Sequence, residues 1–177
     1  MQEQKILILS GLPGSGKTYF AESLKEESEK KRVFIFSQDN QNSQWWKYDQ
    51  WMTNTIIVDG LNLTNDQIIK SIKEVLKYIR LPKQWNIHII RWKPDRDKCL
   101  KNDSGRRAQS SEITIKKATV EEIDLGKIKE KTEMENITVE EREIICETEN
   151  VKLLNQRSYT RGKYLISDEW CLGGTSR

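Results

Sequence analysis

One stretch near the start of the chain decides the fold that we expect: Gly11-Leu12-Pro13-Gly14-Ser15-Gly16-Lys17-Thr18. It follows the apolar run Lys5-Ile-Leu-Ile-Leu9, which has the length and composition of a strand buried on both faces of a parallel sheet. Residues 19–31 come next, with apolar residues on one face of a predicted helix and Glu and Lys opposite. Strand, loop and helix together match the pattern G-x-x-x-x-G-K-S/T in the context that this pattern requires.

The residue types in this stretch suit a phosphate-binding loop. Glycines let the backbone curve around an anion and turn successive N–H groups inward, and the N-terminus of the next helix adds a favourable dipole. Lys17 is predicted to reach the β- and γ-phosphates of ATP, and the Thr18 hydroxyl to ligate Mg²⁺. The alternative is a glycine-rich turn that binds nothing. The predicted nucleotide-binding residues are Gly11, Leu12, Pro13, Gly14, Ser15, Gly16, Lys17, Thr18 and Tyr19.

Strands that alternate with helices over the first 110 residues predict an α/β fold with a parallel sheet. We expect the P-loop NTPase fold, in which helices flank a central, mostly parallel sheet, with a basic lid helix in addition. One domain is expected over residues 1–177, with a core over about 1–111 and an accessory C-terminal region over about 112–177. Further predicted strands cover 33–36, 55–59, 86–92 and 164–166, and further predicted helices cover 43–52, 67–80, 94–107 and 138–148.

Two predicted helix starts depend on capping signals. Asn65 and Asp66 precede the apolar stripe of residues 67–80 and are predicted to cap that helix. Thr138 and Glu141 have the spacing of a capping box, which predicts the start of the helix over 138–148.

Two carboxylates follow predicted strands, at the edge where an open α/β sheet places its ligand crevice. Asp39 lies just past the second strand, where it is predicted to accept a proton from an attacking hydroxyl. The alternative for Asp39 is an N-cap of the next helix. Asp59 ends the third strand and is predicted to hold Mg²⁺ through water or to orient a substrate-binding group, with a structural cap of the strand end as the alternative.

The net charge of +3 is unevenly distributed along the chain. Residues 1–111 carry 19 Lys or Arg against 13 Asp or Glu, residues 112–150 carry 6 against 12, and residues 151–177 carry 5 against 2. Residues 91–107 hold seven Lys or Arg against three Asp. An arginine that closes over a transferring phosphoryl group stabilises its charge, so Arg106, then Arg107, are predicted catalytic residues on a lid. The alternative is a solvated helix face.

Aromatic residues gather directly after the predicted base, at Trp45, Trp46, Tyr48 and Trp51. They are the side chains on which a nucleobase would stack. The alternative, which we favour for at least two of them, is that they pack this segment onto the sheet.

Several features narrow the class of protein. The longest apolar run near the start, residues 6–9, is too short for a signal peptide or a membrane span, so we expect a cytoplasmic protein without a membrane partner. Cys99, Cys146 and Cys171 are widely spaced and indicate neither a zinc site nor a disulfide framework. His88 is predicted to be a strand residue with a satisfied ring, and the sequence leaves the oligomeric state open.

These residues resemble the phage-type polynucleotide 5′-hydroxyl kinase family and its small P-loop relatives. The likeness covers roughly residues 5–115 and rests on residues 11–18, Ser37-Gln-Asp39, Val58-Asp59-Gly-Leu-Asn62-Leu63 and residues 99–107. Residues 167–175 also resemble a tail found in such phage proteins.

The resemblance implies a kinase. It makes Lys17 and Thr18 the residues that handle ATP and magnesium, Asp39 the general base, and Arg106 or Arg107 the contact to the γ-phosphate. The sequence departs from the family after Asp39, where residues 40–44 are Asn-Gln-Asn-Ser-Gln and lack the arginine that helps to hold the acceptor phosphate.

We therefore expect an ATP-dependent phosphotransferase whose leading acceptor is the 5′-hydroxyl of a polynucleotide. The missing arginine favours a second hypothesis, a kinase of a nucleoside, nucleotide or other small metabolite. A third is an ATP-binding regulatory or partner-binding protein with little turnover, which has no need of a base at Asp39.

Overall fold

The computed structural model describes residues 3–28, 32–38, 45–104 and 109–145 of the 177-residue chain. Strands and helices alternate along most of this length. In chain order the elements are β1 (Lys5–Ser10), α1 (Lys17–Glu27), β2 (Val33–Ser37), the 3₁₀ turn η1 (Trp45–Lys47), β3 (Thr55–Asp59), α2 (Asn65–Leu76), the 3₁₀ turn η2 (Pro82–Gln84), β4 (Asn86–Trp92), α3 (Arg96–Asp103), α4 (Gln109–Lys117), α5 (Leu125–Thr132) and β5 (Ile137–Arg142).

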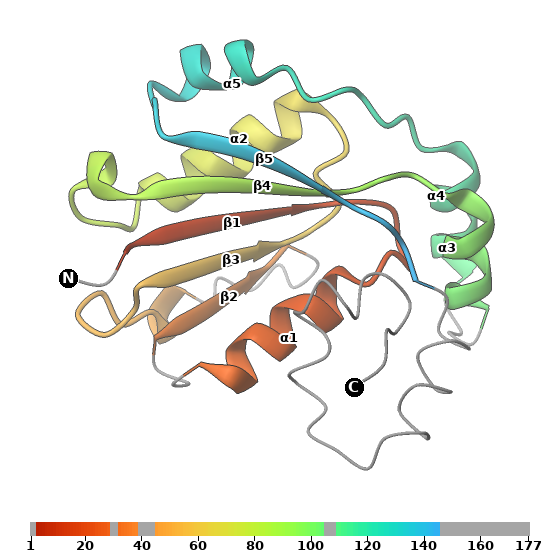
Figure 1. Ribbon diagram of the computed structural model, residues 1–177, viewed down its shortest axis with the longest axis horizontal. Coiled ribbons are helices and arrows are strands. Elements are labelled where there is room, and N and C mark those ends of the chain that lie inside the picture. The colour runs from red at the N-terminus through yellow and green to blue at the C-terminus, as the bar shows by residue number, and fades with distance from the viewer. Residues whose placement is uncertain (1–2, 29–31, 39–44, 105–108, 146–177) are drawn as a thin grey trace.

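The five strands form one parallel sheet in the order β2-β3-β1-β4-β5 (Figure 1). β1 lies at the centre, where Leu7 is opposite Ile57 on one side and opposite His88 on the other. Because all strands run the same way, their carboxyl ends share one edge of the sheet, which is where α/β proteins bind their ligands. We call the two ends of the sheet the carboxyl edge and the amino edge. The predicted fold class is confirmed.

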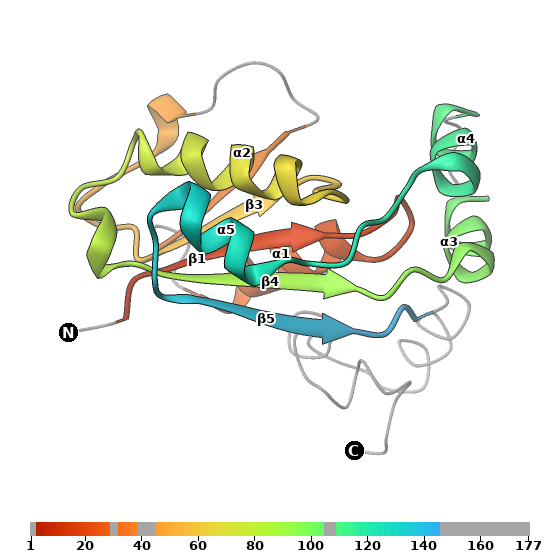
Figure 2. The same cartoon turned by 90° about the horizontal axis from the view of Figure 1, so that it is seen from above.

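Helices cover both faces of the sheet, with α2 and α5 on one face and α1 on the other (Figures 1 and 2). Alternate residues of β1 point to opposite faces, as the period of two in a strand requires. Ile6 and Ile8 belong to the core cluster on the side of α2 and α5, whereas Leu7 and Leu9 belong to the cluster on the side of α1. The apolar run of residues 6–9 therefore forms a strand that is buried on both faces, as predicted.

The prediction of a helix over residues 138–148 is wrong for residues 138–145, the part of this range that the structure describes. β5 lies there instead, with Ile137 opposite Ile87 and Arg142 opposite Trp92 of β4. Without β5, β4 would be an edge strand that presents a row of unpaired backbone groups. Ladder hydrogen bonds and the burial of Ile137 therefore outweigh the local capping signal. The sheet thus extends beyond residue 111.

The prediction of a helix over residues 43–52 is also wrong for residues 45–52, where only η1 is helical. Trp45 is buried and stacks on Tyr78, with ring centroids 4.2 Å apart. Trp45 and Tyr48 both contact Phe34 of β2. Two of the four aromatic residues therefore pack onto the sheet, as we favoured, whereas Trp51 is 76% exposed.

Helix ends differ from prediction by a few residues. Thr64 caps α2, accepting a hydrogen bond from the Gln67 N–H, while the Gln67 side chain accepts one from the Thr64 N–H. Asn65 and Asp66, the predicted caps, thus lie in the first turn. α3 follows its N-cap Asp95 and ends at Asp103. The sequence signals did not predict α4 and α5, and the predicted strand over 164–166 lies outside the described residues.

The prediction for the single histidine was confirmed. His88 lies in β4, and its Nδ1 shares a hydrogen bond with the Thr138 hydroxyl at 2.6 Å. Of the three cysteines, Cys99 is free and buried, whereas Cys146 and Cys171 lie outside the described residues. Within the described residues, no helix has the length and apolar character needed to cross a bilayer.

Candidate active site

The loop between β1 and α1 has a backbone that only glycine suits at two positions. Gly14 has φ +79° and Gly16 has φ +100°, in the left-handed region that side chains disfavour. A Cβ at Gly14 would lie only 2.5 Å from the carbonyl oxygen of Cys99 in α3. The loop is therefore fixed in a curved conformation and packed against α3.

The N-terminus of α1 has no side-chain cap. Its N-cap is Gly16, and its first turn holds no acidic residue. By contrast, α2, α3 and α5 are each capped by a side chain that accepts a hydrogen bond from a backbone N–H of the first turn. The capping residues are Thr64, Asp95 and Asp124. The first N–H groups of a helix have no partner within it, and together with the helix dipole they form a binding site for anions such as phosphate.

The ammonium group of Lys17 is held over this loop. Lys17 is the first residue of α1 and is 8% exposed. Its Nζ donates to the carbonyl oxygens of Gly11 and Leu12 at 2.8 and 2.9 Å and to the Ser15 hydroxyl at 3.1 Å. The positive charge thus lies inside the curve of the loop, where phosphate oxygens can compete for the same donor.

Thr18 and Asp59 come together across the carboxyl edge. The Thr18 hydroxyl donates to Asp59 Oδ2 at 2.9 Å, because β3, which Asp59 ends, is the neighbour of β1. A hydroxyl and a carboxylate beside a phosphate loop fit Mg²⁺, which takes one or two protein ligands together with substrate phosphates. Among the described residues, no group of three His, Cys, Asp or Glu side chains has metal-binding geometry.

A buried polar network lies directly beneath the loop. Asn62, with φ +45°, donates through Nδ2 to the Leu9 carbonyl oxygen at 2.8 Å and accepts from Ser71 at its Oδ1. The Ser10 hydroxyl donates to the Asn62 carbonyl oxygen at 2.7 Å and accepts from Arg91 Nε. Arg91 is 6% exposed, and its burial lowers the pKa of the guanidinium. The network ties β1 to β4 and to the loop after β3.

The same network reaches the end of β2. Gln38 Nε2 donates to the Ser71 hydroxyl at 2.6 Å, and the Gln38 N–H donates to the Asp59 carbonyl oxygen at 2.9 Å. A Cβ at Gly60 would overlap the Gln38 side chain, at 1.8 Å from its Oε1. The residue before Asp39 is therefore fixed at the carboxyl edge, close to the strand that ends in Asp59.

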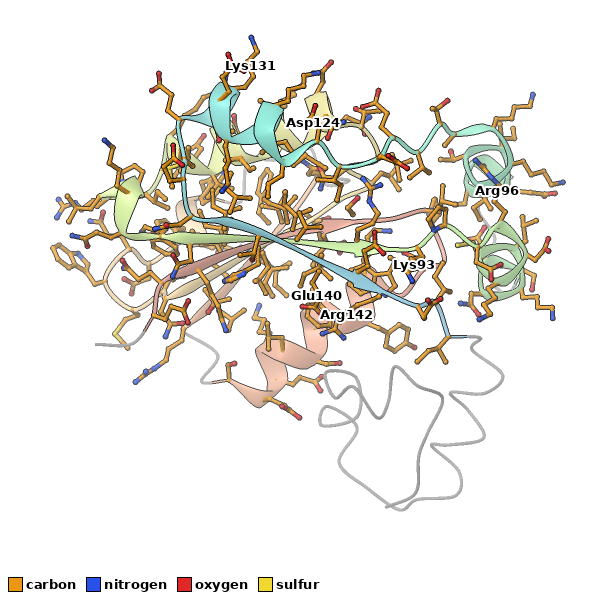
Figure 3. The ribbon with its side chains drawn as sticks, turned by 45° about the horizontal axis from the view of Figure 1, so that its top comes forward. Lys93, Arg96, Asp124, Lys131, Glu140 and Arg142 are labelled. Carbon is orange, nitrogen blue, oxygen red and sulfur yellow. The ribbon has the colours of Figure 1, made fainter. Side chains whose placement is uncertain are left out.

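Helix α3 clamps the loop through Asn102, a residue that sequence reasoning did not assign. Asn102 is 4% exposed, and its Nδ2 donates to the carbonyl oxygens of Gly14 at 2.8 Å and Ile145 at 2.9 Å. Cys99 packs beside the loop, and burial raises the pKa of its thiol to about 11. Arg96 joins α3 to α4, since its guanidinium donates to the Ile115 and Ala118 carbonyl oxygens (Figure 3).

The predicted site residues divide into two groups. Lys17, Thr18 and Asp59 are described, and they lie at one end of the sheet with the predicted nucleotide-binding residues of 11–19. Tyr19 is 51% exposed in the first turn of α1. Asp39, Arg106 and Arg107 lie outside the described residues.

Comparison with known proteins bears on the fold. No family model matches the chain, and no curated protein does. A crystal structure of a fungal RNA kinase superimposes with a TM-score of 0.63, covering 92% of this chain and 81% of that chain at 11% identity. The two chains share a fold. The crystal structure of APE1195 superimposes with a TM-score of 0.48, covering 94% of this chain and 99% of that chain at 15% identity.

Proposed function

We propose that this protein is an ATP-dependent phosphotransferase that moves the γ-phosphoryl group to a hydroxyl. The observation that carries the proposal is the 2.9 Å contact between Thr18 and Asp59 at the mouth of a glycine loop that already encloses an ammonium group. A glycine-rich turn without a ligand has no need of a hydroxyl, a carboxylate and a lysine at the same end of the sheet.

The residues of the loop divide the work of binding the triphosphate. Backbone N–H groups of the loop and the first turn of α1 bind phosphate oxygens. Lys17 exchanges its contacts with Gly11 and Leu12 for the β- and γ-phosphates. Thr18 and Asp59 would hold Mg²⁺, which when bound neutralises charge that develops on the phosphate oxygens. In this role Thr18 and Asp59 would supply oxygen atoms to the ion, with Asp59 acting directly or through water.

The acceptor that we propose is the 5′-hydroxyl of a polynucleotide. Asp39 accepts the proton of that hydroxyl as it attacks, and Arg106 or Arg107 stabilises the charge of the transferring group. The position of Gln38 at the carboxyl edge supports this role for Asp39, and the fold of an RNA kinase supports the acceptor class. The proposed domain spans residues 1–177.

A second candidate is a small-molecule kinase. Residues 40–44 contain no arginine to hold an acceptor phosphate, which favours a nucleoside or another small hydroxyl compound. The two candidates share the site for ATP and differ only in what lies beyond Asp39.

The proposed function is tested by incubation with γ-labelled ATP and a panel of acceptors. The panel holds 5′-hydroxyl DNA, 5′-hydroxyl RNA, nucleosides and nucleotides, with Asp39→Asn as the matched variant. We expect label on the oligonucleotides only, and a loss of transfer by orders of magnitude in Asp39→Asn with ATP affinity retained. Label on small acceptors alone would select the second candidate. ATP binding without any transfer would leave a nucleotide-binding regulatory protein.

A further inference from the structure

Exposed apolar side chains gather at the amino edge of the sheet, opposite the phosphate loop. The described residues include seven large hydrophobic side chains that are exposed, and four of them come from two short segments, 51–52 and 78–81. Arg80 joins the two segments, because its Cζ lies 5.0 Å from the centroid of the Trp51 ring. We call these four residues the amino-edge patch: Trp51, Met52, Tyr78 and Leu81.

Trp51 is presented on a fixed turn. The Asp49 carboxylate accepts hydrogen bonds from the N–H groups of Trp51 at 2.9 Å and Met52 at 3.3 Å, and the Asp49 carbonyl oxygen accepts from Thr53. The indole is nevertheless 76% exposed. A single exposed aromatic residue is ordinary, but a rigid turn that holds an exposed indole beside a guanidinium and further apolar groups resembles a prepared contact surface.

A groove of about 810 Å³ adjoins the patch, and Trp51 and Met52 form part of its wall. Six of its lining side chains are carboxamides of Asn or Gln, which both donate and accept hydrogen bonds. Arg32 and Lys83 add two positive charges to the lining. Its one acidic residue, Glu3, accepts a hydrogen bond from Asn86 Nδ2 at 2.8 Å. The groove is therefore polar and rich in hydrogen-bonding groups, and the side chains that line it carry a formal net charge of +1, from two positive groups and one negative group.

We propose that the amino-edge patch and this groove bind a single-stranded polynucleotide, an inference that rests on the proposed function. Proteins bind single strands by stacking bases on aromatic side chains in a positively charged groove that follows the backbone. Trp51 provides the stacking surface, Arg32 and Lys83 pair with phosphates, and the carboxamides bind base edges. The exposed indole of Trp51, beside a lining with one net positive charge, favours this occupant over a protein segment of mixed charge.

The groove lies far from the site of phosphoryl transfer. It borders Gln4, just before β1, whereas the phosphate loop follows Ser10 at the other end of that strand. The six residues of β1 span about 20 Å at roughly 3.3 Å per residue. A stacked strand advances about 3.4 Å per nucleotide, so a dinucleotide at the active site cannot reach the groove, whereas a strand of about 20 nucleotides can.

The test compares the wild type with Trp51→Ala. Affinity for a labelled, 5′-phosphorylated single strand of about 20 nucleotides is measured by fluorescence anisotropy. Because this strand offers no acceptor hydroxyl, its binding does not depend on the proposed reaction. The control is Ile113→Ala, which removes another exposed apolar side chain, 59% exposed, on α4. Thermal unfolding verifies that both variants fold.

We expect Trp51→Ala to bind the strand at least about fivefold more weakly, from the loss of one base stack, and Ile113→Ala to bind as the wild type does. Transfer to a dinucleotide stays unchanged in both variants. Equal affinity in the wild type and Trp51→Ala overturns the proposal and leaves the proposed function intact. A dimer that depends on Trp51, with unchanged affinity for the strand, makes the patch a contact between copies and also overturns it.

Discussion

Replacement of Asn102 tests whether α3 holds the phosphate loop in shape. Asn102→Leu keeps a side chain of similar size but removes the donor that Gly14 and Ile145 share. Each buried carbonyl that loses its donor costs about 1–3 kcal/mol. Ile145 is only partly buried and regains water, so the loss comes mainly from the Gly14 carbonyl, and we expect about 1–3 kcal/mol in the free energy of unfolding.

The same replacement is expected to weaken ATP binding, because Gly14 then loses the bond that fixes its peptide. Chemical denaturation gives the free energy of unfolding, and calorimetric titration gives the affinity for ATP with Mg²⁺. The control is Asn136→Leu, an exposed asparagine at the amino edge. If Asn102→Leu matched this control in both measurements, the clamp would have no role.

Asn102→Asp adds a dependence on pH that a purely steric role would not produce. A carboxylate at this position faces two carbonyl oxygens in a buried site, so the pKa of the new carboxyl should rise in the folded state. The protonated form still donates one hydrogen bond, so the variant should be least perturbed in acid and should lose stability as the pH rises through the raised pKa. An effect of equal size at every pH would contradict this reasoning.

Further predictions concern the loop and its neighbours. Gly14→Ala should weaken ATP binding and destabilise the fold by more than about 1 kcal/mol, since its Cβ meets the Cys99 carbonyl oxygen at a positive φ. The control is Gly126→Ala in α5, where a Cβ makes only an ordinary contact with Asp124 Oδ1 at 3.6 Å. Asp59→Asn should retain ATP binding without metal and lose most of the gain that Mg²⁺ gives, as measured by titration at several Mg²⁺ concentrations. The Cys99 thiol should stay protonated and unreactive in the native protein up to about pH 10, because burial raises its pKa to about 11. Mass spectrometry of alkylated peptides can follow this reactivity. The stability that the buried thiol contributes is lost as the pH rises from the ordinary thiol pKa to about 11. Fast labelling of Cys99 at neutral pH would refute this prediction.

The sequence predicted those parts of the fold that local pattern determines. Apolar runs predicted four of the five strands. The loop motif predicted the turn between β1 and α1, beside which Thr18 donates to Asp59. β5 was missed because its partner is β4, about 50 residues away in the chain, and a capping signal at Thr138 and Glu141 favoured a helix locally. Pairing along an open sheet edge is a tertiary effect that a short window of sequence does not contain.

The contacts around the loop were less predictable than the loop itself. Asn102 carries no distinctive spacing, and its role follows only from the packing of α3 against Gly14. Arg91 looked like one more charge in a basic segment, yet it is buried and binds the Ser10 hydroxyl. The turn that exposes Trp51 depends on Asp49, which no helical or strand pattern indicates.

Binding of ATP with Mg²⁺ is the central claim, and calorimetric titration of the wild type beside Lys17→Ala tests it most directly. We predict saturable binding of one nucleotide per chain in the wild type, together with a rise in the unfolding temperature. Lys17→Ala should remain folded but lose most of that affinity, because it removes the ammonium group that lies inside the loop. A wild type that gives neither heat of binding nor a thermal shift, or a Lys17→Ala variant that binds equally well, would contradict the account.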